Sequence, residues 1–190
     1  MSEIFQSENL ADAAAAIQRG ELVAFPTETV YGLGADATNP DAVKKVYQAK
    51  GRPSDNPLIV HVTGPAQVAE FAEIDAQSKQ LMDTFWPGPL TIILPIKPHA
   101  LDPVVTGGLT TAAFRNPDTP LTLKLIEQAG VPLVGPSANT SGKPSPTKPA
   151  HVMHDLDGKI AGVLDGGETK IGVESTVLDM SGAVPSVLRP

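Results

Sequence analysis

The order of apolar patterns along the 190 residues is the feature that most restricts the fold. Segments with helical periodicity alternate with short strand-like runs as far as residue 135, and strand-like runs then follow one another near the end. Alternation of strands and helices is typical of a sheet covered by helices, whereas consecutive strands are typical of antiparallel neighbours. The pattern therefore predicts an α/β layered fold built around a mixed sheet.

The clearest helix is predicted at residues 39–51, where Asn39 is the N-cap, Pro40 occupies the first turn and Gly51 ends the helix. Further helices are predicted at residues 7–20, 65–74, 75–86, 118–130 and 149–156, the first opened by Ser7 and the fourth by Asp118. Strands are predicted at residues 21–25, 57–62, 90–96, 110–115, 131–135, 160–165, 175–180 and 186–190.

Composition restricts the class of protein. There are no cysteines, which excludes disulfides, thiolate metal sites and a catalytic thiol. The net charge of -7 opposes broad attraction to nucleic acid or to an anionic membrane, so any site for a polyanion must be local. The start resembles no signal peptide and no apolar run is long enough to span a membrane, so we expect a soluble, cytoplasmic protein.

Three stretches resemble known nucleotide- or metal-binding motifs, but the surrounding sequence does not support these functions. The stretch GLGADA at residues 32–37 fits a dinucleotide fingerprint, with Asp55 as a ribose ligand, but PTETVY separates it from the preceding strand. SGKPSPT lacks the earlier glycine of a P-loop. His151 and His154 stand at helical spacing without a third metal ligand nearby in the sequence.

Three polar loops next to strands remain as candidates for a binding site. FPTETVYGLG, KGRPSDNPL and VGPSANTSGKPSPT combine hydroxyls, an amide and cations with glycine and proline, which suits a zwitterion or a nucleotide. Each could also be a well-tied turn. His61 lies in an apolar strand, and Arg115 ends another strand, where its guanidinium could grip a carboxylate.

Taken in order, these elements resemble the YrdC-like family of L-threonylcarbamoyladenylate synthases. The matching stretches run from about residue 20 to the end of the chain: FPTETVYGLG, KGRPSDNPL with the following LIVHV, WPGPLT, an Arg before PD, PSANTSG and ESTV. The resemblance implies a YrdC-like layered fold with a twisted mixed parallel/antiparallel sheet and flanking helices.

The resemblance also implies a reaction. ATP, L-threonine and bicarbonate would give L-threonylcarbamoyl-AMP and pyrophosphate, with Mg²⁺ accompanying ATP, and the product would pass to a separate tRNA threonylcarbamoyl transferase. The implied threonine site consists of Thr29, His61, Arg115, Gly135 and Ser175. The implied ATP site consists of Lys50, Arg52, Asn56, Thr111, Ser137, Asn139, Ser145 and Arg189, with Lys50 and Arg52 as the catalytic cations.

Domain extent and two other functions stay open. Residues 1–190 are expected to form a single YrdC-like catalytic domain; longer relatives continue through a linker into a second domain, so a short-form enzyme and an excised domain both fit. One alternative function is a carbamoyl-adenylate-forming module. The other is a non-enzymatic RNA-binding or ribosome-maturation factor, and a weak RNA contact is also compatible with the main hypothesis.

Overall fold

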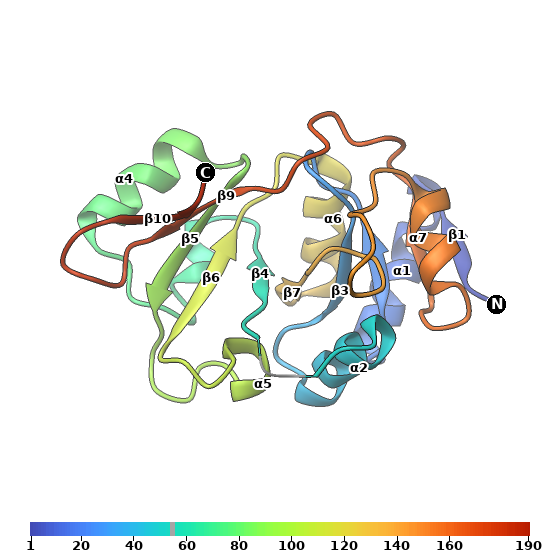
Figure 1. The fold of residues 1–190 in the computed structure, drawn as a ribbon, viewed down its shortest axis with the longest axis horizontal. Helices are drawn as coiled ribbons and strands as arrows, with labels where there is room; N and C mark the ends of the chain where they lie inside the picture. Colours follow the sequence, from blue (N-terminus) through green and yellow to red (C-terminus); the bar gives the residue numbers. More distant parts are fainter. Residues whose placement is uncertain (54–55) are drawn as a thin grey trace.

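The computed structural model describes residues 1–53 and 56–190, so Asp55 lies outside the described residues. Its centre is a ten-stranded sheet (Figure 1). In spatial order the strands are β1 (Glu3–Phe5), β8 (Gly162–Leu164), β2 (Val23–Phe25), β3 (Gly32–Asp36), β7 (Leu133–Val134), β4 (Ile59–His61), β6 (Thr111–Arg115), β5 (Leu90–Pro95), β9 (Thr176–Asp179) and β10 (Ser186–Arg189).

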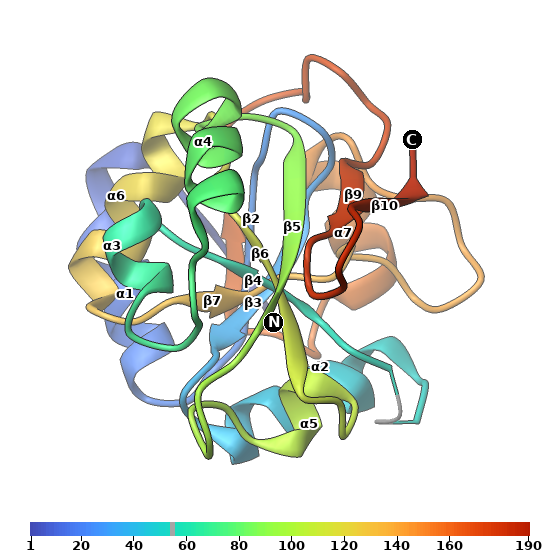
Figure 2. The same ribbon diagram turned by 90° about the vertical axis from the view of Figure 1, so that its left-hand side faces the viewer.

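The sheet is mixed, which confirms the predicted fold class. β4 pairs with β6 in parallel, as does β5 with β9, whereas β5 pairs with β6 and β9 with β10 in antiparallel fashion. The strands cross at a marked angle when the sheet is seen from its side, as expected for a right-handed twist (Figure 2). β1 and β10 are the two edges, so the termini lie at opposite ends of the molecule (Figure 1).

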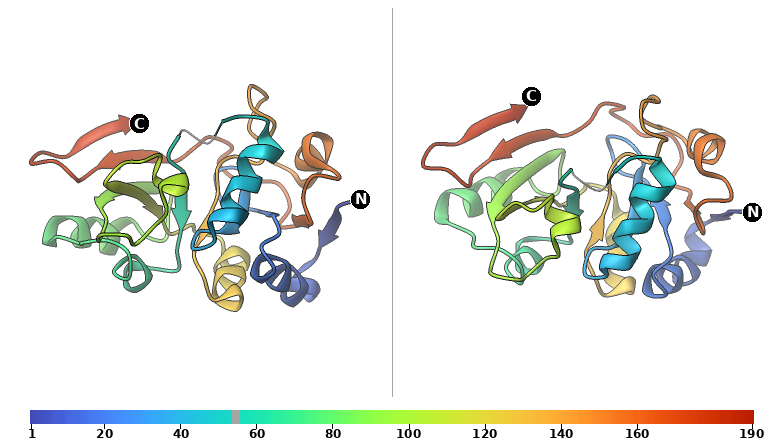
Figure 3. Two further views of the ribbon diagram at one scale, coloured as in Figure 1. Left: turned by 90° about the horizontal axis from the view of Figure 1, so that it is seen from below. Right: turned by 60° about the horizontal axis from the view of Figure 1, so that its bottom comes forward.

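Helices flank the sheet (Figure 3). The helices are η1 (Ser7–Asn9), α1 (Leu10–Gln18), α2 (Pro40–Lys50), α3 (Pro65–Val68), α4 (Ala76–Phe85), α5 (Pro103–Thr106), α6 (Pro120–Ala129) and α7 (Pro149–Leu156). One apolar cluster joins α1 and α6 to Phe25 and Leu133, while a larger one joins α2, α4 and α7 to β3, β4, β5 and β6. The two clusters bury opposite faces of the strands, because Ala24 and Val134 belong to the larger cluster and their neighbours Phe25 and Leu133 to the smaller one.

The helix α2 agrees closely with its predicted ends. The side-chain oxygen of Asn39 accepts from the backbone N–H of Asp41 at 3.1 Å and of Ala42 at 3.3 Å. Pro40 is the first residue of the helix, and Gly51 adopts the left-handed conformation with φ of 70° at its end. These caps place Lys50 in the last helical turn and Arg52 outside the helix.

Three predicted helices differ in extent. The chain leaves the helical path after Val68, because Ala72 forms a bridge to Ile96 and Lys97 donates its backbone N–H to the carbonyl of Phe71. Ser7 does not cap a helix but belongs to a 3₁₀ turn that precedes α1. Asp118 does not open α6 either, since Thr119 is the N-cap and the backbone N–H of Asp118 donates to Glu28.

The strand β3 was not predicted, because its glycine-rich sequence resembled a loop. Gly32 and Gly34 sit there because the ring of Phe25 packs against them: a Cβ at Gly32 would lie 2.9 Å from Phe25 Cζ, and one at Gly34 would lie 2.8 Å from Phe25 Cδ1. The glycines thus allow close packing between neighbouring strands. The same strand excludes the dinucleotide interpretation of GLGADA, because these residues pair in a sheet and form no phosphate loop.

Membrane insertion by a helix finds no support in the described part of the chain, where no helix combines the length and the apolar character needed to cross a bilayer.

Replacing the cap of α2 tests the helix that positions both cations. We expect Asn39→Ala to lower the free energy of unfolding by about 1 kcal/mol, because two backbone N–H groups lose their acceptor. Asn39→Asp keeps an acceptor at the same position and serves as the control, for which we expect little change. Urea denaturation measures both values; equal losses in the two variants would contradict a capping role.

Candidate functional site

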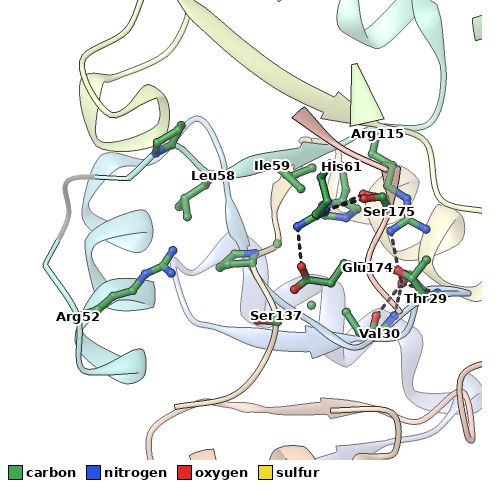
Figure 4. Close-up of a pocket in the computed structure, with 16 residues that line it drawn as sticks. Thr29, Val30, Arg52, Leu58, Ile59, His61, Arg115, Ser137, Glu174 and Ser175 are labelled. Carbon is green, nitrogen blue, oxygen red and sulfur yellow. Dashed lines mark hydrogen bonds and ion pairs between the residues drawn. The ribbon is translucent and has the colours of Figure 1, made fainter. Parts of the chain in front are cut away.

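A pocket of about 180 Å³ opens where several loops meet near the ends of β2, β4 and β6 (Figure 4). Its volume lies below the range of about 300–1,000 Å³ that is usual for drug-sized ligands, so the enclosed part suits a small molecule. It is lined by Thr27, Thr29, Val30, Gly32, Arg52, Pro57, Leu58, Ile59, His61, Arg115, Gly135, Pro136, Ser137, Glu174, Ser175 and Arg189.

Strand register brings the polar residues of the pocket together. His61 on β4 is the cross-strand partner of Arg115 on β6, and Arg115 is the partner of Thr91 on β5, so these three side chains share one face of the sheet. Ser175, just before β9, extends the row because its Oγ lies 2.7 Å from Thr91 Oγ1. Residues separated by more than a hundred positions thus form one wall.

Arg115 is held from three sides. Its side chain is 4% exposed and forms an ion pair with Glu28, while its Nη1 donates to Thr29 Oγ1 at 2.9 Å and its Nε donates to the carbonyl of Gly88 at 3.3 Å. The second oxygen of Glu28 accepts from the backbone N–H of Asp118 at 2.9 Å. A guanidinium has five N–H donors, so Arg115 keeps further donors for a ligand in the pocket.

His61 is a neutral imidazole buried beside the pocket. Burial, and secondarily the charge of Arg115, lowers the pKa of His61 to about 3. The ring packs edge-on against Phe25 with centroids 5.0 Å apart, and a Cβ at Gly135 would lie 2.7 Å from His61 Nδ1. This Nδ1 has no hydrogen-bond partner among the described residues. His61 can therefore offer a ring nitrogen to a ligand without carrying charge.

Lys50 lies behind the pocket and does not line it. Its side chain is buried, and its Nζ donates to the carbonyls of Ser137 and Asn139, the latter at 2.8 Å. Burial, followed by the nearby charge of Arg52, lowers the pKa of Lys50 to about 8. The ammonium group thus fixes the loop that begins at Gly135, and it places a positive charge close to that loop.

Arg52 and Arg189 bring two cations to the pocket itself. The guanidinium of Arg52 stacks on Tyr47 with its carbon 5.5 Å from the ring centroid, and its buried Nε has no hydrogen-bond partner among the described residues. Arg189 donates from Nε to the carbonyl of Ser175 at 2.7 Å and from Nη1 to Glu174 at 2.6 Å. In Figure 4, Arg52 stands on one side of the pocket, with Arg115, Thr29 and Ser175 on the other.

Eight of the thirteen residues predicted for the site line this pocket. All five of the threonine set do so, and so do Arg52, Ser137 and Arg189 of the ATP set. Of the other five, Lys50 fixes the loop, and Asn139 ties the same loop by donating from its amide to the carbonyls of Thr140 and Lys143. Ser145 lies 3.4 Å from Glu174, Asn56 is exposed, and Thr111 stands at the opposite end of β6 from Arg115.

Two carboxylates at the site were not predicted as site residues. Glu28 lies between two threonines in the FPTETVYGLG stretch, and Glu174 directly precedes Ser175 in the ESTV stretch. The available signal was their place inside FPTETVYGLG and ESTV, two of the stretches that carry the family resemblance. Their partners could not be inferred, since Arg115 and Arg189 are distant in sequence. No group of three or more metal-ligating side chains occurs within residues 1–53 and 56–190.

The fold and the pocket define an α/β protein whose site combines cations, hydroxyls and a neutral imidazole. The chain belongs to the Sua5/YciO/YrdC family, described as "Telomere recombination", whose sequence pattern matches residues 15–190. A threonylcarbamoyl-AMP synthase of Bacillus subtilis is 61% identical over 95% of this chain and 53% of its own length. Another, from Pyrococcus abyssi, is 54% identical over 94% of this chain and 52% of its own length.

Solved structures agree with this assignment. The crystal structure of P. abyssi Sua5 complexed with L-threonine superposes with a TM-score of 0.96 at 49% identity, covering 100% of this chain and 57% of that one. Escherichia coli YciO, at 21% identity, shares the fold with a TM-score of 0.88. The chain spans about half the length of these two curated relatives from B. subtilis and P. abyssi.

Removing the charge of Glu28 tests the ion pair that holds Arg115. We expect Glu28→Gln to lower the free energy of unfolding by about 3–5 kcal/mol, because it leaves a buried guanidinium without a counter-charge. Glu21→Gln is the matched control: it breaks the exposed pair with Arg19 and should change stability by less than about 1 kcal/mol. Similar losses in the two variants, measured by urea denaturation, would contradict the role assigned to Glu28.

Buried, neutral His61 should make stability depend on pH. In the unfolded chain a histidine has a pKa of about 6.5, so between pH 6.5 and 3 the unfolded state binds a proton that the folded state does not. Stability is therefore lost as the pH falls through this range, by about 2 kcal/mol at pH 5 from this residue. In His61→Asn, we expect the decrease in the free energy of unfolding between pH 7 and pH 5, measured by urea denaturation, to be smaller by that amount. An unchanged decrease would contradict the role assigned to His61.

Proposed function

We propose that this chain synthesises L-threonylcarbamoyl-AMP from L-threonine, bicarbonate and ATP, with release of pyrophosphate. The observation that carries the proposal is the meeting of all five residues of the implied threonine site in one pocket, next to Arg52, Ser137 and Arg189 of the implied ATP site. Similarity to threonylcarbamoyl-AMP synthases and to a Sua5 protein complexed with L-threonine supports this product and L-threonine as a substrate. We infer that the product serves a separate tRNA threonylcarbamoyl transferase.

The amino acid would bind at the Arg115 side of the pocket. Arg115 retains donors for the carboxylate, and a guanidinium can grip a carboxylate with two parallel hydrogen bonds. The hydroxyls of Thr29 and Ser175 stand beside it to hold the remaining polar groups of threonine. His61 stays neutral there, so it adds a polar contact without repelling the ammonium group of the incoming amino acid.

The triphosphate would bind at the Arg52 side. Arg52 has an unpartnered Nε among the described residues, and the loop after β7 presents Ser137 to the same space. Lys50 would act from behind this loop, where it fixes the backbone and contributes positive charge without contacting a phosphate. Mg²⁺ accompanying ATP would supply further charge compensation.

The chemistry needs positioning more than it needs a protein nucleophile. The uncharged amine of threonine attacks the carbon of bicarbonate, the nitrogen loses a proton, and the bond from this carbon to the hydroxyl breaks with release of water. An oxygen of the resulting carbamate then attacks the α-phosphorus. The bond from the α-phosphorus to the bridging oxygen breaks, and pyrophosphate leaves with that oxygen. Holding threonine in the pocket and the triphosphate at its Arg52 side makes the attack intramolecular in effect, and fixed cations stabilise the charge on the phosphates.

Pyrophosphate release tests this function. We expect pyrophosphate release from ATP and Mg²⁺ only when both L-threonine and bicarbonate are present. We expect Arg52→Ala to reduce the rate by roughly 100-fold, which is the effect of removing one charge-stabilising donor from an enzyme active site. Arg19→Ala is the matched control, since it removes the same charge from an exposed pair with Glu21 that does not line the pocket. Mass spectrometry identifies the product.

The same assay separates the two alternatives. Release that requires carbamoyl phosphate in place of threonine and bicarbonate would favour a carbamoyl-adenylate-forming module. Absence of turnover together with a salt-sensitive RNA complex would favour a binding protein, and the enzymatic proposal would be withdrawn.

A further inference from the structure

Glu174 is the one carboxylate among the described residues that line the pocket. One oxygen accepts from Arg189 Nη1 at 2.6 Å, and the other lies 3.4 Å from Ser145 Oγ. Its side chain is 40% exposed, so this residue of the pocket lining is partly open to solvent. A negative charge therefore stands between two residues that the family resemblance assigns to ATP.

This placement is unfavourable for a bare triphosphate, because two like charges at close range repel each other. The other unpredicted acid of the site, Glu28, is different: it is buried, and both of its oxygens are occupied by Arg115 and the backbone of Asp118. Glu174 has an exposed ion pair and can exchange its partner. A carboxylate that faces a polyphosphate and can change partners suits a divalent cation.

We propose that Glu174 contacts the Mg²⁺ that accompanies ATP, and that Arg189 passes from this carboxylate to a phosphate oxygen when MgATP binds. Mg²⁺ in nucleotide sites is commonly held by one or two carboxylates together with substrate phosphates and water, so one carboxylate is sufficient. The guanidinium of Arg189 suits a phosphate as well as a carboxylate. The inference rests on the proposed function, in that this pocket must bind ATP.

The exchange keeps every charge paired. Before binding, Glu174 and Arg189 neutralise each other. After binding, the carboxylate faces the cation and the guanidinium faces a phosphate, so neither is left without a partner. The hydrogen bond from Arg189 Nε to the carbonyl of Ser175 does not involve Glu174, so it can keep Arg189 close to the pocket before and after MgATP binds.

Calorimetric titration with ATP tests the inference, once with excess Mg²⁺ and once with a chelator. The measured quantity is the ratio of the two affinities. We expect Mg²⁺ to strengthen ATP binding to the unmodified chain. We expect Glu174→Gln to reduce the ratio of the two affinities by roughly tenfold or more, the usual effect of substitutions around a metal site. Glu174→Gln should bind metal-free ATP as well as, or better than, the unmodified chain, because a repulsive charge is gone.

Two further variants serve as controls. Glu168→Gln removes the same charge from the segment that precedes β9, at a side chain that does not line the pocket, and should keep the full advantage of Mg²⁺. Glu174→Asp retains the carboxylate on a shorter side chain and should keep part of the gain in ATP affinity that Mg²⁺ gives. Thermal denaturation checks that each variant folds, and Glu174→Asp provides the test if Glu174→Gln does not.

The outcomes separate the explanations. Equal weakening of both forms of ATP in Glu174→Gln would mean that Glu174 only orients Arg189, and equal strengthening would mean that it only repels phosphate; either result overturns the inference. If the unmodified chain binds neither form, the inference and the ATP site both fail. If the ratio changes as expected but no pyrophosphate is released with threonine and bicarbonate, the metal contact stands and the proposed reaction fails.

Discussion

The site depends on the buried ion pair between Arg115 and Glu28. Arg115 ends the strand β6, and Glu28 belongs to the loop that follows β2, so the pair joins two parts of the sheet that are not neighbours. Isolated in a buried site, either charge would be strongly unfavourable; together, and with the Thr29 hydroxyl and the Asp118 N–H as further partners, both are satisfied. The guanidinium is thereby held in one orientation toward the pocket.

The same logic explains the glycines and the aromatic ring around His61. Phe25 occupies the space that side chains at Gly32, Gly34 and Gly135 would fill, and its ring supports the imidazole of His61. An apolar support of this kind keeps the imidazole uncharged beside Arg115, because burial and a neighbouring cation both disfavour protonation. The pocket can thus present one fixed cation and one neutral polar ring side by side.

Local signals in the sequence predicted much of this arrangement. Caps predicted α2 to within a residue because Asn39, Pro40 and Gly51 act on adjacent backbone groups. The helix expected at residues 65–74 is mostly absent because a bridge to Ile96, over twenty residues away, competes for Ala72. The polar loops of the site could be identified from their composition, but the pairing of Glu28 with Arg115 and of Glu174 with Arg189 depends on tertiary contacts that no short stretch encodes.

The stretch from Lys50 to Arg52 shows how the end of a helix can give two cationic residues different roles. Lys50 lies in the last turn of α2, where its side chain is directed into the protein and its ammonium meets the carbonyls of the Ser137 loop. Gly51 then ends the helix in the left-handed conformation, so Arg52 lies outside the helix and lines the pocket. An ammonium is a compact donor that suits several carbonyls, and a guanidinium is a planar fork that suits phosphate. The two positions therefore call for different cations, and exchanging them would leave each site with the wrong geometry.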